Sequence, residues 1–536
     1  MGTFALPSLR LPKFAPPRQV TREEVYKNRY LIAFAVTLAS VLELVDTSIV
    51  NVAIPHMMGS LGATLEEVAW VSTGYIVANV IILPLTSWLS GRFGRRNYYT
   101  GSIAIFTVAS FFCGNAHTLG ELVGARVVQG IGGGALISTA QAILFDVFPA
   151  KERGIGQAIF GMGVMVGPTL GPTLGGWITD NFAWPWIFYI NLPLGIMAGI
   201  LTWQLVPEPD HGREQADHVD WIGLGLLILG IGCLQILLER GESRDWFASQ
   251  EIVAEAFGAV IGIVGFVWHE LTTEHPIVDL RILKNRQLAA GVTYGLGLGF
   301  ALYASVFALP VFLQSVLGYT AWDTGKVILP GALASAVTMG VVGRNAPKLD
   351  ARVMIMIGTG LFFASMYLHS HFTTQTGLGD TLLPMILRGV GLGCIFVPLT
   401  NASVADLQPY QLGQGTGLFN LSRQLGGSFG IAISATLLHR FSEQAMDGLR
   451  AHQSLYDPGT QAYLAALVQK FTALHGDATR AVAQANLVLY RVLYRQAQTL
   501  AATRLFLTMG IAFVCSLPLL LRFRTGRLIP GSSAAH

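Results

Sequence analysis

Charged residues are scarce in this chain. Of its 536 residues, 12% are Asp, Glu, Lys or Arg, whereas 52% are hydrophobic. A soluble domain usually carries about 25% charged residues, and the mean hydropathy here is +0.53. This composition argues against a soluble enzyme, a nucleic-acid-binding protein and a disordered protein. The net charge of +3 is also too small to indicate a polyanionic partner.

Cysteines and common enzyme motifs are equally sparse. The four cysteines lie inside apolar runs without CxxC spacing, so we expect small buried thiols without disulfides or metal. The Walker pattern, GxxxxGK followed by Ser or Thr, does not occur, which argues against ATP-driven pumping. We expect no enzyme activity, no cofactor and no metal site, and we interpret His369 and His371 as solvated residues near a helix end.

Long apolar runs, in contrast, fill most of the chain. A membrane-spanning helix needs about 20 mostly apolar residues, and fourteen runs meet this length approximately. They predict an all-α polytopic membrane protein with fourteen transmembrane helices. The runs are 31–56, 68–90, 97–116, 119–148, 154–177, 185–206, 219–238, 252–272, 287–317, 321–343, 352–370, 380–406, 412–439 and 501–521.

Lys and Arg gather in alternate connections, and this pattern predicts the orientation in the membrane. The basic segments are 1–30, 91–96, 151–153, 281–286, 344–352 and 522–536. Among the short connections expected on the outer side, only the one between the predicted spans 219–238 and 252–272 carries basic residues, Arg240 and Arg244. We therefore expect a cytoplasmic N-terminal arm, 1–30, and a cytoplasmic tail, 522–536.

An internal repeat divides the predicted helices into groups of six, two and six. The loop that begins Gly91-Arg92 has a counterpart that begins Gly343-Arg344, and the helix containing Arg126 has one containing Arg388. Two six-helix halves around a central cavity are the plan of many secondary transporters. The predicted units are an N-terminal half, 31–206, two inserted helices, 219–272, and a C-terminal half, 287–521.

One predicted connection, 440–500, is much longer than the others and belongs to the outer side. Its apolar residues recur at helical spacing between charged ones, which favours an amphipathic hairpin outside the membrane. A solvated loop with some helix is the simpler interpretation. The functional interpretation is a docking surface for a periplasmic partner.

Ionisable residues are rare within the predicted spans, and each needs a partner or a water-filled cavity. Asp46 lies roughly 14 Å and Arg126 roughly 10 Å from the outer ends of their helices, at 1.5 Å per residue. An ion pair is therefore allowed. The positive charge of Arg126 would favour the ionised form of Asp46, whereas burial would favour its neutral form. Asp46 could therefore load and release a proton. A static structural pair is the alternative.

Glu43 lies one helical turn before Asp46, on the same face, near the depth of Arg423. It could line a substrate cavity, select cationic ligands or join the proton relay. The alternative is a buried Glu held by hydrogen bonds.

The predicted fifth helix carries glycines every four residues and two Gly-Pro pairs. Such a stripe lets another helix approach closely, and the prolines favour bends. Generic helix packing would explain a single GxxxG, whereas this combination indicates a gating element. Its residues are Gly163, Gly167, Pro168, Gly171, Pro172, Gly175 and Gly176.

The inner loop after the second predicted helix contains Arg92, Gly94, Arg95 and Arg96. Its arginines could serve only to orient the chain in the membrane. Alternatively, they form a latch that binds helix ends or acidic groups in one state and releases them in the other.

Over roughly residues 30–521, these motifs resemble the fourteen-helix drug:proton antiporters of the major facilitator superfamily, of the EmrB/QacA type. The segments that carry the resemblance are 44–55, Arg126 with Gln129, Gly130, Gly132 and Gly133, then 167–176 and 184–195. The long connection 440–500 is similar to the EmrB branch. Gly91 stands where the superfamily usually carries Asp, so a latch through that Asp cannot operate here.

The resemblance implies a proton-coupled multidrug exporter in the inner membrane that works with a periplasmic adaptor and an outer-membrane channel. We place proton coupling at Asp46, Arg126 and Glu43, and a substrate cavity at Glu43, Gln129, Arg388 and Arg423. The alternative is a dedicated exporter of an endogenous metabolite such as a fatty acid or siderophore. A membrane-embedded transferase would need a His/Asp/Glu cluster, which is not evident, and the repeat favours alternating access over a channel.

Overall fold

The computed structural model describes residues 22–208, 219–452, 457–475 and 477–523. Within these ranges the chain is helical and contains no strand. The N-terminal arm and the tail expected to be cytoplasmic fall largely outside the described residues, which exclude 1–21 and 524–536.

Fourteen long helical segments form the membrane part of the described chain, as predicted. Twelve are apolar and long enough to cross a membrane, with α6 and α7 acting as one segment; α3 and α14 are long but less apolar. The segments are α1 (Arg22–Leu61), α2 (Leu65–Phe93), α3 (Arg95–Gly114), α4 (Leu119–Val147), α5 (Arg153–Asn181), α6 (Trp186–Tyr189) with α7 (Asn191–Leu205), α8 (Trp221–Arg240), α9 (Gln250–Thr272), α10 (Arg286–Ser315), α11 (Ala321–Asn345), α12 (Ala351–His369), α13 (Leu378–Val404), α14 (Leu412–His452) and α16 (Ala478–Val514).

Two of these segments differ from simple apolar rods. The predicted span 185–206 is interrupted at Ile190, between α6 and α7. Pro193 has no N–H to donate to the carbonyl of Tyr189, so the helical ladder loses a bond at this point. α14 continues as far as His452 and α16 begins at Ala478, so both helices extend well beyond their apolar runs.

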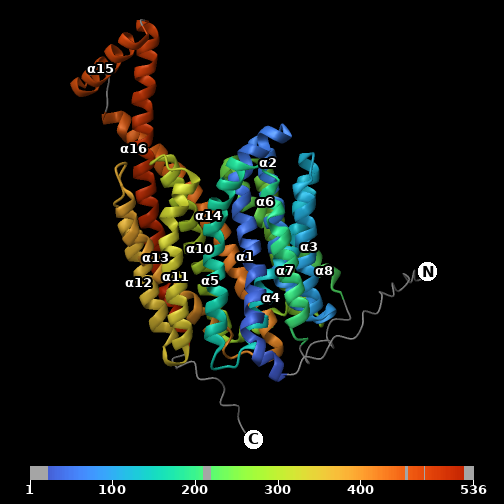
Figure 1. Cartoon of the computed structure of the whole chain (residues 1–536). Helices are drawn as coiled ribbons and strands as arrows, with labels where there is room; N and C mark the ends of the chain where they lie inside the picture. Colours follow the sequence, from blue (N-terminus) through green and yellow to red (C-terminus); the bar gives the residue numbers. More distant parts are fainter. Residues whose placement is uncertain (1–21, 209–218, 453–456, 476, 524–536) are drawn as a thin grey trace.

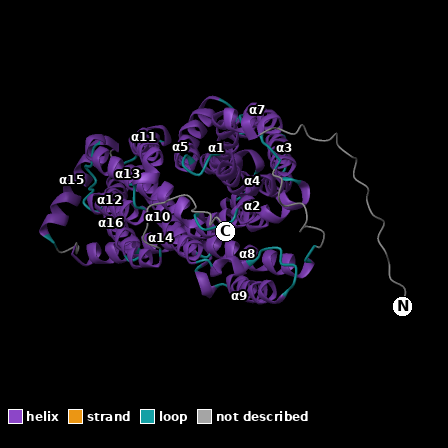
Figure 2. Ribbon diagram, turned by 90° about the horizontal axis from the view of Figure 1, so that it is seen from below, coloured by secondary structure: helices purple, strands orange, loops and turns teal. Residues whose placement is uncertain are grey.

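The helices form two groups with the inserted pair beside them. α1 packs against α5 and α7, while α10 packs against α14 and α16. α8 packs against α9 and reaches both groups through α2 and α14, as the view in Figure 2 shows. On another side the groups meet through α5 and α11.

Small residues bring the two groups together near the predicted cytoplasmic ends of their helices. Gly154 of α5 and Gly343 of α11 face each other so closely that a Cβ on either would meet the other's backbone. Gly413 of α14 lies against Ser87 of α2. We therefore describe this end of the bundle as closed between the two groups.

A helical hairpin projects from the opposite end of the bundle (Figure 1). It consists of the end of α14, α15 (Pro458–His475) and the first half of α16. A small apolar cluster of Ala445, Met446 and Ala497 joins α14 to α16. The region predicted as an amphipathic hairpin is thus helical.

Candidate functional site

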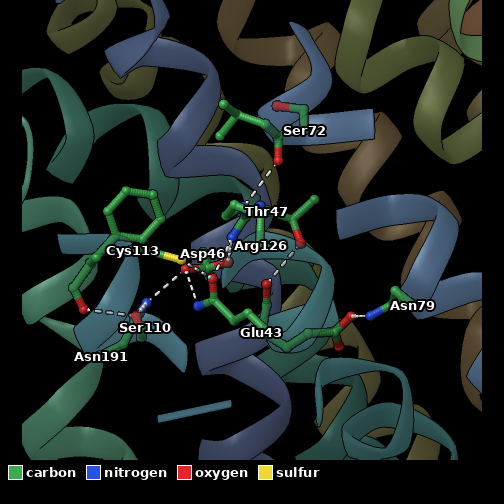
Figure 3. A network of polar contacts seen from close by, with 12 residues as sticks. Glu43, Asp46, Thr47, Ser72, Asn79, Ser110, Cys113, Arg126 and Asn191 are labelled. Atoms are coloured by element: carbon green, nitrogen blue, oxygen red, sulfur yellow. Dashed lines mark hydrogen bonds and ion pairs between the residues drawn. The ribbon is translucent and has the colours of Figure 1, made fainter. Parts of the chain in front are cut away.

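The buried ion pair between Asp46 of α1 and Arg126 of α4 is the centre of the candidate site (Figure 3). Arg126 Nη1 lies 2.5 Å from Asp46 Oδ2, and the two side chains are 1% and 0% exposed. The similar depths inferred from sequence thus correspond to direct contact in the fold.

Neutral side chains complete the coordination of the Asp46 carboxylate. Gln129 Nε2 and Asn191 Nδ2 donate to Asp46 Oδ1 at 3.0 and 2.7 Å. Asn191 also donates to Ser110 Oγ at 3.0 Å, which links α7 to α3. Both oxygens of the carboxylate therefore have donors from the surrounding helices.

Arg126 is held by its own set of contacts. Its Nε donates to the carbonyl of Val71 at 3.1 Å, and its Nη1 donates to Gln129 Oε1 at 2.8 Å. The Tyr75 ring lies 4.0 Å from the guanidinium carbon, at cation–π distance. Acceptors from α1, α2 and α4 therefore engage this guanidinium group.

Glu43 forms a separate polar group one turn away on α1. Its Oε1 accepts a hydrogen bond from Asn79 Nδ2 of α2 at 2.8 Å, as Figure 3 shows. Its Oε2 is buried and has no partner among the described residues. Glu43 interacts electrostatically with both Arg423 and Asp46.

The residues predicted to line one substrate cavity lie in different surroundings. Gln129 belongs to the Asp46 pair, whereas Arg423 of α14 interacts with Glu43. Arg388 of α13 is buried among the helices of the second group, and its Nη1 reaches Ser305 Oγ of α10 at 3.5 Å.

The glycine stripe of α5 packs directly against α1, the helix that carries Glu43 and Asp46. A Cβ at Gly167 would lie 2.8 Å from Leu44 Cβ, and one at Gly171 would lie 2.6 Å from Ser48 Cβ. Gly163 and Gly175 make equally close contacts with the same helix. Gly176 belongs to another face, because its nearest neighbour is Ala321 of α11.

Pro168 and Pro172 lie in the middle of this stripe, yet α5 runs without interruption from Arg153 to Asn181. Each proline removes one backbone hydrogen bond from the helix interior. The helix that separates α1 from α11 is therefore weakened locally where it contacts the ion-pair helix.

The inner loop contacts acidic groups on two neighbouring segments. Arg95 forms an ion pair with Asp146 at the end of α4, and the backbone N–H of Arg96 donates to Glu208 Oε2 at 3.3 Å. The Arg96 guanidinium lies 4.7 Å from the Trp203 ring centre, and that of Arg92 lies 5.7 Å from the Trp88 ring centre. Gly94 has a φ of +84°, a conformation that favours glycine.

Sequence reasoning missed the amides that organise these charges. Asn191 lies in a motif noted only as typical of the family, and Asn79, Gln141 and Asn420 were given no role. A polar amide inside an apolar run is a usable signal, because it needs a buried hydrogen-bond partner. The spacing alone does not say which charge each amide contacts.

Comparison with known proteins identifies the family. The profile of the Major Facilitator Superfamily matches residues 36–431. The chain belongs to this superfamily. It is 36% identical to the multidrug export protein EmrB of Escherichia coli K12 over 438 residues, which cover 81% of this chain and 84% of that protein. These findings confirm the predicted EmrB branch of the drug:proton antiporters within the superfamily.

Other members of the superfamily are also similar to this chain. EmrB of Haemophilus influenzae is 34% identical and covers 81% of this chain, with 85% of that protein matched. The fatty acid resistance protein FarB of Neisseria gonorrhoeae is 35% identical over 76% of this chain and 80% of its own length. The crystal structure of the human organic anion transporter MFSD10 superposes with a TM-score of 0.59 at 15% identity, covering 92% and 99% of the two chains, and shows the shared fold.

Proposed function

We propose that this EmrB-branch transporter exports hydrophobic or amphipathic small molecules in exchange for protons. The observation that carries the proposal is the buried Asp46–Arg126 pair, a titratable carboxyl group enclosed by helices of a transporter fold. The names of the EmrB relatives as multidrug export proteins support the same function. A proton moving down the membrane potential releases about 2.3 kcal/mol per 100 mV.

A second candidate function is the dedicated export of one endogenous metabolite, such as a fatty acid or siderophore. The similarity to FarB, whose name refers to fatty acid resistance, favours this alternative. Both candidates use the same proton-coupled cycle and differ in the range of substrates.

Proteoliposomes with the purified transporter test the function directly. We expect added substrates to cause movement of protons down an imposed pH gradient, measured with a pH-sensitive dye, for several chemically unrelated compounds. A response to a single metabolite would favour the dedicated exporter. Substrate movement unaffected by dissipating the pH gradient and the membrane potential would overturn proton coupling.

We further propose that the transporter lies in the inner membrane with both ends in the cytoplasm, and that the helical hairpin binds a periplasmic adaptor of a tripartite pump with an outer-membrane channel. The first half of α16 exposes a row of apolar side chains although it projects beyond the bundle. Its members Leu487, Tyr490 and Tyr494 lie at helical spacing and are each 47–48% exposed. Exposed apolar patches of this kind mark interaction sites.

Replacing Leu487 and Tyr490 by Glu is expected to abolish docking while transport by the isolated protein continues. Charges on the apolar row would have to lose water in the interface, whereas neither residue contacts the ion-pair site. The measurements are cross-linking to the adaptor, cellular drug resistance and transport in liposomes. Arg480→Gln, an exposed change on the same helix, is the matched control. Retained cross-linking would remove the docking role, and lost liposome transport would assign these residues to the transport cycle.

A further inference from the structure

The guanidinium group of Arg423 is buried but only partly hydrogen-bonded. The residue is 1% exposed, and its Nη2 donates to Asn420 Oδ1 at 3.3 Å. Its Nε and Nη1 atoms have no hydrogen-bond partner in the part of the chain that the structure describes. Arg423 thus keeps unused N–H donors where α14 packs against α2 and α4.

A chain of amides braces this arginine from the opposite half. Asn420 Nδ2 donates to Gln141 Oε1 of α4 at 2.7 Å, and Gln141 Nε2 donates to Gln157 Oε1 of α5 at 3.1 Å. Asn420 Nδ2 also donates to the carbonyl of Thr416 at 3.0 Å. These contacts direct the Asn420 oxygen toward Arg423, so one side of the guanidinium has a positioned acceptor.

The other half shows what a fully paired buried arginine looks like. Arg126 has an aspartate at 2.5 Å, an amide oxygen and a backbone carbonyl as acceptors. Arg423 has one amide oxygen. Arg423 forms no contact ion pair among the described residues, and a buried cation of this kind is costly in a membrane-spanning helix. Arg423 can therefore gain more from an anion than Arg126 can.

Glu43 is the acidic group that interacts electrostatically with Arg423, but it does not neutralise it by direct contact. Its Oε1 accepts from Asn79, and its Oε2 has no hydrogen-bond partner among the described residues. The cation and the carboxyl group are therefore close enough to interact electrostatically, and no hydrogen bond joins them in the described structure.

We propose that Arg423, braced by Asn420, receives the carboxylate of an amphipathic organic anion, and that Glu43 sets the charge preference of this subsite. The planar guanidinium fork matches a carboxylate with two parallel N–H···O bonds, a geometry that an ammonium group does not offer. The inference rests on the proposed transport function and specifies one class of substrate for it. In its ionised form, Glu43 would oppose anions and favour cations at the same place.

Binding to the purified full-length protein in nanodiscs, without any gradient, tests the subsite. The probes are 4-(1-pyrene)butanoate, the corresponding trimethylammonium compound and pyrenebutanol, which share one aromatic body and differ in charge. We expect Arg423→Gln to weaken butanoate binding by about tenfold or more, because the charge-assisted hydrogen bonds to the carboxylate are lost. Binding of the alcohol should change little.

Two further variants keep the test decisive if Arg423→Gln does not fold. Arg423→Lys retains the charge but lacks the planar fork, so the anion should bind more weakly than to the unmodified protein. At alkaline pH, where the Glu43 carboxyl group is ionised, Glu43→Gln should strengthen anion binding and weaken cation binding. Arg344→Gln removes an exposed positive charge at the end of α11 and should leave all three affinities unchanged.

Equal losses for anion, cation and alcohol would overturn the assignment, as would unchanged butanoate binding in both Arg423 variants. If chloride displaces the butanoate probe as effectively as dodecanoate does, the site binds small anions. That result would exclude a site for amphipathic anions. Proton-coupled transport of the cationic probe in liposomes is measured separately. If it persists while the anion preference is absent, this inference fails and the proposed function stands.

Discussion

Replacing Asp46 by Asn is expected to abolish export driven by a pH gradient. Asn has nearly the same shape as Asp but cannot bind or release a proton, so the variant cannot couple proton flow to the change of state. The measurement is substrate accumulation in proteoliposomes with and without an imposed pH gradient. Gradient-driven export at the normal rate would rule out Asp46 as the proton carrier.

The same substitution should also lower stability, because it leaves Arg126 buried without its counter-ion. Breaking a buried ion pair by removing one partner costs about 3–5 kcal/mol. The double variant Asp46→Asn with Arg126→Gln removes both charges and should recover much of the lost melting temperature. If the double variant recovers folding but not gradient-driven export, the loss of export is due to proton coupling. If it recovers both, the ion pair has a purely structural role.

Gly171→Leu is expected to stop the transport cycle. A Cβ at this position already lies 2.6 Å from Ser48 Cβ, so a leucine side chain must force α5 away from α1. Overpacking of this kind costs about 1–3 kcal/mol and separates the helix bearing Asp46 from the helix that contacts the opposite half. The measurements are substrate binding and export in proteoliposomes. We expect the folded variant to bind substrate but not to export it.

Gly360→Leu provides the matched control, because it makes the same change on the exposed side of α12, where an added Cβ meets nothing within 4 Å. We expect this variant to export normally. Normal export by Gly171→Leu as well would show that the close contact between α1 and α5 is not needed for the cycle.

The length of the apolar runs was sufficient to predict the helical membrane fold, because burial of the backbone in lipid leaves few alternatives to a helix. Depth along two helices likewise suggested that Asp46 could meet Arg126. Both predictions depend on distance along the chain, which can be counted in the sequence. Residue spacing shows that α5 has a face of small residues, but it does not show that α1 is the helix packed against that face.

The rotation of α12 about its own axis explains why the prediction for His369 was wrong. His369 was expected to be solvated near a helix end, but it is fully buried against Phe372 and Phe506. Its position in the chain gives its depth, whereas the direction in which it points depends on how α12 packs. The roles of Asn420 and Gln141 were missed for the same reason, because their contact joins residues 279 positions apart.

The unbroken course of α14 has a mechanical consequence. This helix has 41 residues, or about 60 Å at 1.5 Å per residue. One end of α14 lies beside Ser87, where the two helix groups are in contact, and its other end is part of the projecting hairpin. Arg423 lies about a quarter of the way along the helix from the first end. A stiff helix of this length acts as a lever. A tilt of a few degrees at the end where the two helix groups are in contact moves the hairpin by several ångströms. A protein docked on the hairpin would therefore be displaced once in every transport cycle.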